Sequence, residues 1–352
     1  MKHYGAAVQE AEEIPISLQR ERILRVTRQY CITPTEAYWF RLYRDPDKAL
    51  DYVYGAETAG MHLLLNGRRR LEDHDALMDK AAVSDRLKGL GLPVVPTLAL
   101  LETCSGEHVK ELERLALTES RGVFVKARTG SRAQGAFWVS GSAASSTLKG
   151  RLLTGRPING AKDVRAALKT LCRNDTALVQ PRLGNHPFLA SVSSKDTAAV
   201  LRVISQRRYK TNETVCLLSA HLRLPVEHSR PRAKTQELEA VLRVDTEFGR
   251  ITRSPTSELS LRKTTEKIEK SIFDGLGFDA KVPFWQQIHD SSLAAHEAYS
   301  QLWAIAWDWI VTPEGPRILE GNVIWGMRRP QLMDGGMIAI LENATSSRAK
   351  KT

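Results

Sequence analysis

The chain has 352 residues, of which 42% are hydrophobic and 26% are charged, an ordinary composition for a globular protein of two or three packed lobes. Its net charge of +11 favours anionic partners such as nucleotide phosphates, nucleic acid or a membrane surface. The basic residues are spread out without a nucleic-acid-binding motif, and no apolar run approaches the roughly 20 residues that span a bilayer, so we expect neither a nucleic-acid nor a membrane partner.

The cysteines and the N-terminus indicate a cytoplasmic protein. The four cysteines are far apart and lack the spacing of metal ligands, which is typical of reduced thiols. Glu10, Glu12 and Glu13 stand where a signal peptide would need a basic and then an apolar run. We therefore expect a soluble protein of the cytoplasm.

Residues 1–75 are predicted to be helical. Ile23 and Val26 recur at helical spacing. Thr33-Pro34-Thr35-Glu36 has the pattern of a capping box, with Thr at the N-cap, Pro at the first helical position and Glu at the third. Asp45-Pro46 repeats this start signal. The region shows no chemistry of its own.

Two lysines follow, one in a helix and one at the end of a strand. Lys80 lies in a helix predicted over residues 75–88, where a lone lysine is typical of a solvated surface. Lys126 ends a buried strand that leads into a small, basic loop bearing Gly130 and Ser131. Such a loop is suited to covering a polyphosphate, although a plain solvated hairpin is the alternative. It matches neither the P-loop nor the Rossmann pattern.

The middle of the chain is predicted to be mainly strands. Residues 177–181 form a short buried strand that leads into a loop, and residues 198–205 and 214–224 form two more. Arg202 interrupts the first of these two, where it either extends to solvent or faces an anion site. Residues 225–236 form a polar, basic loop.

Residues 303–322 read as a β-hairpin that contains three polar residues. If Pro313-Glu314-Gly315 is a three-residue loop with a positive φ at Gly315, Thr312 pairs with Pro316 and Asp308 lies opposite Glu320. Strand alternation places Asn322 on the face of Glu320. An oxygen-only set of this kind suits Mg²⁺ that itself holds phosphates. The alternative is an exposed Asp308 and a strand end at residues 320–322.

Three signals follow one another along the chain: the helix with Lys80, the strand that ends at Lys126 with its glycine-bearing loop, and the hairpin with Asp308, Glu320 and Asn322. This order resembles the ATP-grasp superfamily. The segments MDKAAVSDRLKGLGLPVVPT, VFVKARTGS, LVQPRLGNHP, LRVIS and WDWIVTPEGPRILEGN are similar to the sugar-transfer-associated ATP-grasp family, which is related to α-L-glutamate ligases. The resemblance covers roughly residues 40–335 and implies an α+β fold in which two lobes hold a nucleotide between them. It implies a helical N-terminal region (1–75), a small lobe with the phosphate-covering loop (76–180), a large lobe with the metal site (181–345) and a disordered tail (346–352).

The resemblance also implies roles for individual residues. Lys80 and Lys126 would contact ATP, and Gly130 and Ser131 would belong to the phosphate-covering loop. Gln180, Pro181 and Leu183 would lie in the lobe connection that holds adenine. Asp308, Glu320 and Asn322 would hold Mg²⁺, and Arg202 would meet phosphate or the reacting carboxylate. Residues 227–232 and the pair Gln180 and Arg182 depart from the family pattern, so neither the family's substrate nor its ribose contact is carried over.

The implied function is an ATP- and Mg²⁺-dependent carboxylate–amine ligase that forms an amide or peptide bond through an acylphosphate, with Lys126 and Arg202 as catalytic residues. Its substrates would be a small-molecule or peptide carboxylate and an amine. The alternatives are a kinase of a small hydroxyl substrate on the same fold and a non-catalytic basic binding protein. The histidines are scattered, and only His186 and His228 lie in loops near the expected cleft.

Overall fold

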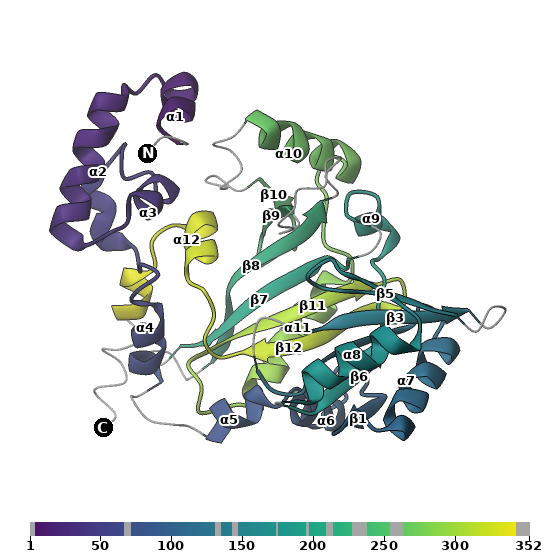
Figure 1. The fold of residues 1–352 in the computed structure, drawn as a ribbon. Helices are drawn as coiled ribbons and strands as arrows, with labels where there is room; N and C mark the ends of the chain where they lie inside the picture. Colours follow the sequence, from purple (N-terminus) through teal and green to yellow (C-terminus); the bar gives the residue numbers. More distant parts are fainter. Residues whose placement is uncertain are drawn as a thin grey trace.

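The computed structural model describes residues 4–66, 72–130, 135–142, 147–173, 175–194, 197–208, 214–226, 238–253 and 263–342. Two six-stranded antiparallel sheets form its centre, and a group of helices from the N-terminal region lies to one side of them (Figure 1). This confirms the predicted α+β class and the helical start. The predicted tail (346–352), Ser131, His228 and most of the loop 225–236 lie outside the described residues.

Most of the N-terminal region packs around one apolar core, which also includes Leu332, whereas Leu65 packs against the second sheet. Its elements are α1 (Gly5–Glu12), α2 (Ile16–Tyr30), α3 (Pro34–Trp39), the 3₁₀ helix η1 (Pro46–Asp51) and α4 (Thr58–Leu65). The capping box is confirmed, because Thr33 accepts from the Glu36 amide while the Glu36 side chain accepts from the Thr33 amide. Ile23 and Val26 pack with Tyr38 in this core, as their spacing predicts.

The first sheet has the strand order β1-β6-β2-β3-β4-β5. Its strands are β1 (Ala99–Leu101), β2 (Val123–Ala127), β3 (Phe137–Ser142), β4 (Thr147–Leu152), β5 (Pro157–Asn159) and β6 (Ala177–Pro181). Two helices cover one face, α7 (Gly106–Thr118) and α8 (Ala161–Cys172). Val123 and Val125 point toward these helices, so alternation along β2 turns Lys126 to the opposite face.

The second sheet has the order β10-β9-β8-β7-β11-β12. Its strands are β7 (Val200–Arg207), β8 (Val215–Val226), β9 (Leu238–Val244), β10 (Ile251–Thr252), β11 (Ala304–Thr312) and β12 (Gly315–Asn322). The core on one face includes Leu201, Leu222 and Trp307 and is covered by α11 (Trp285–Glu297). The helices α5 (Glu72–Met78) and α6 (Lys80–Gly89) contribute Leu77, Val83 and Leu87 to the same core.

Three further helices complete the fold, α9 (Pro187–Ala190), α10 (Lys263–Leu276) and α12 (Arg328–Asp334). In Figure 1, α12 lies between the second sheet and the N-terminal helices. Its Asp334 side chain accepts from Arg243 and from Ser219, which ties α12 to β8 and β9. Within the described ranges, no helix is both long enough and apolar enough to cross a membrane.

The β11–β12 hairpin differs from its predicted form at the turn. The expected three-residue loop is wrong: Thr312 pairs with Gly315, so the loop contains only Pro313 and Glu314. A bulge then adds one residue to β12, because Asp308 pairs with Glu320 while Trp309 pairs with Ile318. The opposition of Asp308 and Glu320 is therefore confirmed, although two deviations produce it. Gly315 has the expected positive φ of 122°.

Candidate active site

A row of polar residues crosses five neighbouring strands of the second sheet. Register partners place Arg243 beside His221, His221 beside Arg202, Arg202 beside Asp308 and Asp308 beside Glu320. Directly paired residues share one face of a sheet, so the row lies opposite the face that α11 covers. The tryptophans flanking Asp308 point into the core, which leaves the carboxylate on the polar face.

Arg202 and Asp308 form a two-pronged ion pair at the centre of this row. The Arg202 Nε and Nη2 atoms each donate to one Asp308 carboxylate oxygen at 2.7 Å. The Asp308 residue is only 4% exposed, so the arginine supplies the positive charge that a buried carboxylate needs. Arg202 therefore faces a carboxylate of the protein itself, and its contact with phosphate or a substrate carboxylate stays a prediction.

Lys126 reaches the row from the first sheet. Its Nζ atom lies 3.9 Å from a Glu320 carboxylate oxygen. The residue is 4% exposed, and its Nζ atom has no hydrogen-bond partner within the part of the chain that the structure describes. Burial lowers the pKa of Lys126 to about 8, and Lys80 adds to this shift while Glu320 and Asp308 oppose it. The two sheets thus bring a buried cation against the carboxylates of the hairpin.

The Lys80 side chain is hydrogen-bonded to the start of the glycine-bearing loop. Its Nζ atom donates to the Thr129 carbonyl at 3.1 Å and to the Gly130 carbonyl at 2.7 Å. The neighbouring Asp79 caps α6 and pairs with Arg128, whose hydrogen bonds lower the pKa of the Asp79 carboxyl. Lys80 and Asp79 therefore hold both the backbone and a side chain where β2 leaves the sheet. The contact of Lys80 with ATP stays a prediction.

The predicted lobe connection runs along the end of β6. Gln180 is 3% exposed and donates to the Val95 carbonyl at 3.4 Å. Its Oε1 atom is buried without a hydrogen-bond partner among the described residues. Pro181 and Leu183 are half-buried, and between them Arg182 stacks over Trp138 at 3.7 Å. The assignment of Gln180, Pro181 and Leu183 to adenine stays a prediction.

The carboxylate and amide oxygens on the hairpin are ligands of the kind that a hard cation prefers. Glu320 is half-buried, and Asn322, on the same face of β12, donates to the Ala306 carbonyl at 3.4 Å. Each oxygen of Asp308 already accepts one hydrogen bond from Arg202, so a metal would have to use the remaining lone pairs unless Arg202 turns away. The described residues contain no group of three or more His, Cys, Asp or Glu side chains that could hold a metal ion.

Four residues near the site are absent from the sequence prediction: Trp39, His221, Arg328 and Arg329. They line a pocket, together with Arg202, where α3, the second sheet and the start of α12 meet. Local patterns give no sign of it, because its walls come from segments far apart in the chain.

The hydrogen bonds of His186 are structural. Its ring accepts from the Phe188 amide, and its own amide donates to the Val311 carbonyl.

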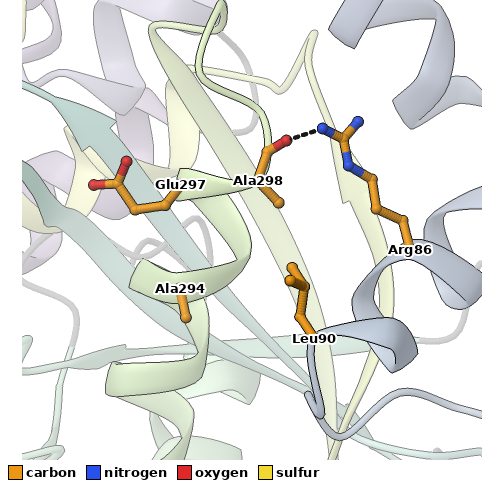
Figure 2. A pocket seen from close by; sticks show the side chains of 5 residues that line it. All are labelled: Arg86, Leu90, Ala294, Glu297 and Ala298. Atoms are coloured by element: carbon orange, nitrogen blue, oxygen red, sulfur yellow. Dashed lines mark hydrogen bonds between the residues drawn. The ribbon is translucent and has the colours of Figure 1, made fainter.

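A second hollow lies on the outside of the molecule, between α6 and α11. Arg86 and Leu90 form one side of it, and Ala294, Glu297 and Ala298 form the other (Figure 2). Arg86 donates a hydrogen bond to the Ala298 carbonyl. None of the predicted site residues lines this hollow.

Several solved structures are similar to this chain, all at low sequence identity. The ATP-grasp ligase PsnB, solved with a minimal precursor, is 14% identical over 78% of this chain with a TM-score of 0.42. The D-alanine–D-alanine ligases of Coxiella burnetii and Bacillus anthracis are 16% and 12% identical over 87% and 78% of this chain, with TM-scores of 0.44 and 0.46. This chain covers 62%, 66% and 70% of these three proteins, respectively.

The comparison with sequence profiles identifies one protein family. No curated protein matches the sequence. The sequence profile described as sugar-transfer associated ATP-grasp matches residues 64–345, which include both sheets and every residue predicted for the site. Its match begins near the end of α4. The chain belongs to the sugar-transfer associated ATP-grasp family.

Proposed function

We propose that the protein is an ATP- and Mg²⁺-dependent ligase that joins a carboxylate to an amine. The observation that carries this proposal is the position of Lys126. A buried ammonium without a hydrogen-bond partner among the described residues is costly, and here it faces Glu320 and the Arg202–Asp308 pair from the other sheet. In an ATP-grasp protein, the polyphosphate of the nucleotide is the anion expected to stabilise this buried ammonium.

The remaining side chains fit complementary roles. Glu320 and Asn322 would hold Mg²⁺, with Asp308 joining them if Arg202 turns toward substrate. Bound Mg²⁺ would neutralise charge on the phosphates. Lys80 would fix the loop that contains Gly130 and Ser131 over the nucleotide. Gln180, Pro181 and Leu183 would support adenine, and Arg202 would orient the reacting carboxylate.

The reaction proposed has two steps. A carboxylate oxygen of the first substrate attacks the γ-phosphorus of ATP, which forms an acylphosphate and breaks the bond to ADP. The amine nitrogen of the second substrate then attacks the acyl carbon, inorganic phosphate leaves with the bonding electrons, and the nitrogen loses a proton. Positioning and charge neutralisation drive phosphoryl transfer, and these are what Lys126 and Arg202 supply.

Product analysis tests this function. The full-length protein would be incubated with Mg²⁺-ATP and pooled small-molecule and peptide carboxylates and amines, and the products would be identified by mass spectrometry. We expect ADP and phosphate release only when both a carboxylate and an amine are present, together with a product lighter than the two substrates by one water. A phosphorylated hydroxyl product, or an absence of Mg²⁺-ATP binding in calorimetry, would contradict the proposal.

We also propose that the enzyme works in the cytoplasm, with 1–75, 76–180 and 181–345 as its domains. The four cysteines, all within the described residues, are free thiols, which suits a reducing compartment that supplies ATP. Two separate apolar cores, one for each sheet, support two lobes, although Leu77, Val83 and Leu87 of the range 76–180 pack in the core of the second sheet.

A further inference from the structure

The pocket beside Arg202 is continuous with the proposed catalytic row but is built largely by other parts of the chain. The N-terminal region contributes Glu36, Trp39 and Phe40 among others, the second sheet contributes Arg202 and His221, and the segment before and within α12 contributes Gly326, Met327, Arg328 and Arg329. A second molecule that meets a reacting group held at Arg202 therefore has room to extend toward α3 and α12.

Two residues of this pocket have buried polar atoms without a hydrogen-bond partner among the described residues. His221 is 1% exposed, and neither of its ring nitrogens has a hydrogen-bond partner among the described residues. The indole Nε1 of Trp39 is also buried, and it too has no partner within the described ranges. Buried polar atoms are rarely left unsatisfied in folded proteins, so three of them in one pocket point to a bound molecule that completes their hydrogen bonds.

The available hydrogen bonds are mainly those of donors. The indole nitrogen can only donate. Burial, reinforced by Arg202, Arg329 and Arg223, lowers the pKa of His221 well below its ordinary value, so the imidazole is neutral and offers one N–H. The molecule in the pocket must therefore provide acceptor oxygens.

The charge of the pocket favours an anion. Three guanidinium groups line it, of which Arg202 is paired with Asp308, so Arg328 and Arg329 stand against the single lining carboxylate of Glu36. That carboxylate is already used, since its oxygens accept from Thr33 and from the Gly55 amide. Arg328 stacks over the Trp39 ring at 4.1 Å, which presents a guanidinium at the mouth of the pocket.

We propose that this pocket holds an anionic group of the amine substrate, so that the second substrate is an amine that also carries a carboxylate or a phosphate. This inference rests on the proposed ligase function and specifies its substrate class. Trp39 and His221 would donate to the anion, and Arg328 and Arg329 would neutralise it. The N-terminal region, which the sequence left without chemistry, becomes the part of the protein that selects the substrate.

Matched pairs of small amines test this inference on the full-length protein. Binding of β-alanine and β-alaninamide, and of O-phosphoethanolamine and ethanolamine, would be measured by NMR titration with the nucleotide site filled by Mg²⁺ and a non-hydrolysable ATP analogue. We expect the anionic member of at least one pair to bind at least about tenfold more tightly than its neutral partner, the size of one charge-assisted contact. The pair that responds distinguishes a carboxylate from a phosphate.

Variants connect the preference to the pocket. Arg329→Met is expected to lose most of the preference for the anionic partner, and Trp39→Phe, which keeps the ring but removes the N–H, is expected to weaken it severalfold. Arg114→Met, an exposed arginine on α7, serves as the matched control and should leave the preference unchanged. A cooperative thermal unfolding transition would show that each variant is folded.

The outcomes separate the inference from the proposed function. Equal binding of both members in both pairs, binding of neither anion, or an unchanged preference in folded Arg329→Met and Trp39→Phe would overturn the anion pocket while leaving ATP binding intact. A protein that fails to bind the Mg²⁺–nucleotide complex would overturn the ligase function itself.

Discussion

The ammonium of Lys126 lies 3.9 Å from the carboxylate of Glu320, and each comes from a different sheet. Lys126 is buried and lacks a hydrogen-bond partner among the described residues, while the Glu320 side chain is 26% exposed. The contact is thus too long for a strong hydrogen bond and leaves the lysine under-satisfied. Three of the predictions below follow from this row of charges, and the fourth concerns the core behind it.

Replacing Lys126 with Met is expected to stabilise the protein without nucleotide at neutral pH while weakening ATP binding. The folded pKa of about 8 lies below the ordinary 10.5, so the unfolded state binds more protons between these values, and stability rises with pH across that window. Below pH 8 the burial costs about 3 kcal/mol, which Lys126→Met removes.

Urea unfolding at pH 7 and at pH 10.5 measures this effect. The gain from Lys126→Met should be largest at pH 7 and should largely disappear near pH 10.5, where the lysine is neutral in the folded state and half neutral in the unfolded state. The control is Lys88→Met, an exposed lysine on α6, which should give no gain at either pH. A gain from Lys126→Met that is independent of pH would contradict the buried-charge explanation.

Glu320→Gln is expected to abolish turnover and leave the fold intact. The amide keeps the size of the side chain but removes a negative charge that would hold Mg²⁺ and that supports the charged form of Lys126. ADP release reports turnover, and circular dichroism reports the fold. Turnover at the wild-type rate would remove Glu320 from the metal site.

The Arg202–Asp308 pair should behave as one unit. Asp308→Leu alone leaves the Arg202 guanidinium without the carboxylate that both of its donating nitrogens use, and we expect a loss of about 3 kcal/mol in the free energy of unfolding. The double variant Arg202→Met with Asp308→Leu should recover most of this stability. A double-mutant cycle by urea unfolding measures the coupling, and additive losses would show that the two residues are independent.

His296 should make the protein sensitive to acid. The imidazole is buried, its Nε2–H donates to the Leu302 carbonyl, and its Nδ1 accepts from the Ser205 hydroxyl, an arrangement that requires the neutral ring. Burial lowers the pKa of His296 to about 4. Between pH 6.5 and 4 the unfolded state therefore binds more protons, so stability falls with falling pH, by about 3 kcal/mol in total.

Unfolding free energies measured from pH 7 to pH 4 give this slope. In His296→Gln the part of the slope due to His296 should disappear, although the variant starts from a lower stability because it disturbs the Ser205 contact. The more exposed His289, on the same helix, provides the control variant His289→Gln, which should keep the wild-type slope. An unchanged slope in His296→Gln would assign the acid sensitivity to other groups.

Local signals in the sequence predicted local structure well. Thr33 and Glu36 specify their capping box within four residues, and the alternation of β2 places Lys126 on a polar face, whereas Glu320 reaches its polar face only through the bulge in β12. The anion pocket could not be predicted in this way. Trp39, His221 and Arg329 look like ordinary surface or core residues in their own segments, and only the packing of α3 and α12 against the second sheet brings them together.

Asp308 and Glu320 face each other because β12 contains one extra residue. Their opposition therefore depends on the number of residues in this strand rather than on the identity of the side chains. With the short turn at Pro313-Glu314, an unbulged ladder would set Leu319 across from Asp308 and would direct Glu320 into the tryptophan-rich interior. Ile318, which pairs with Trp309 just before the bulge, is also held on its other side, because its amide donates to the Pro93 carbonyl and its carbonyl accepts from the Val95 amide. A proline-bearing linker from the first half of the chain thus fixes β12 at the residue where the bulge begins.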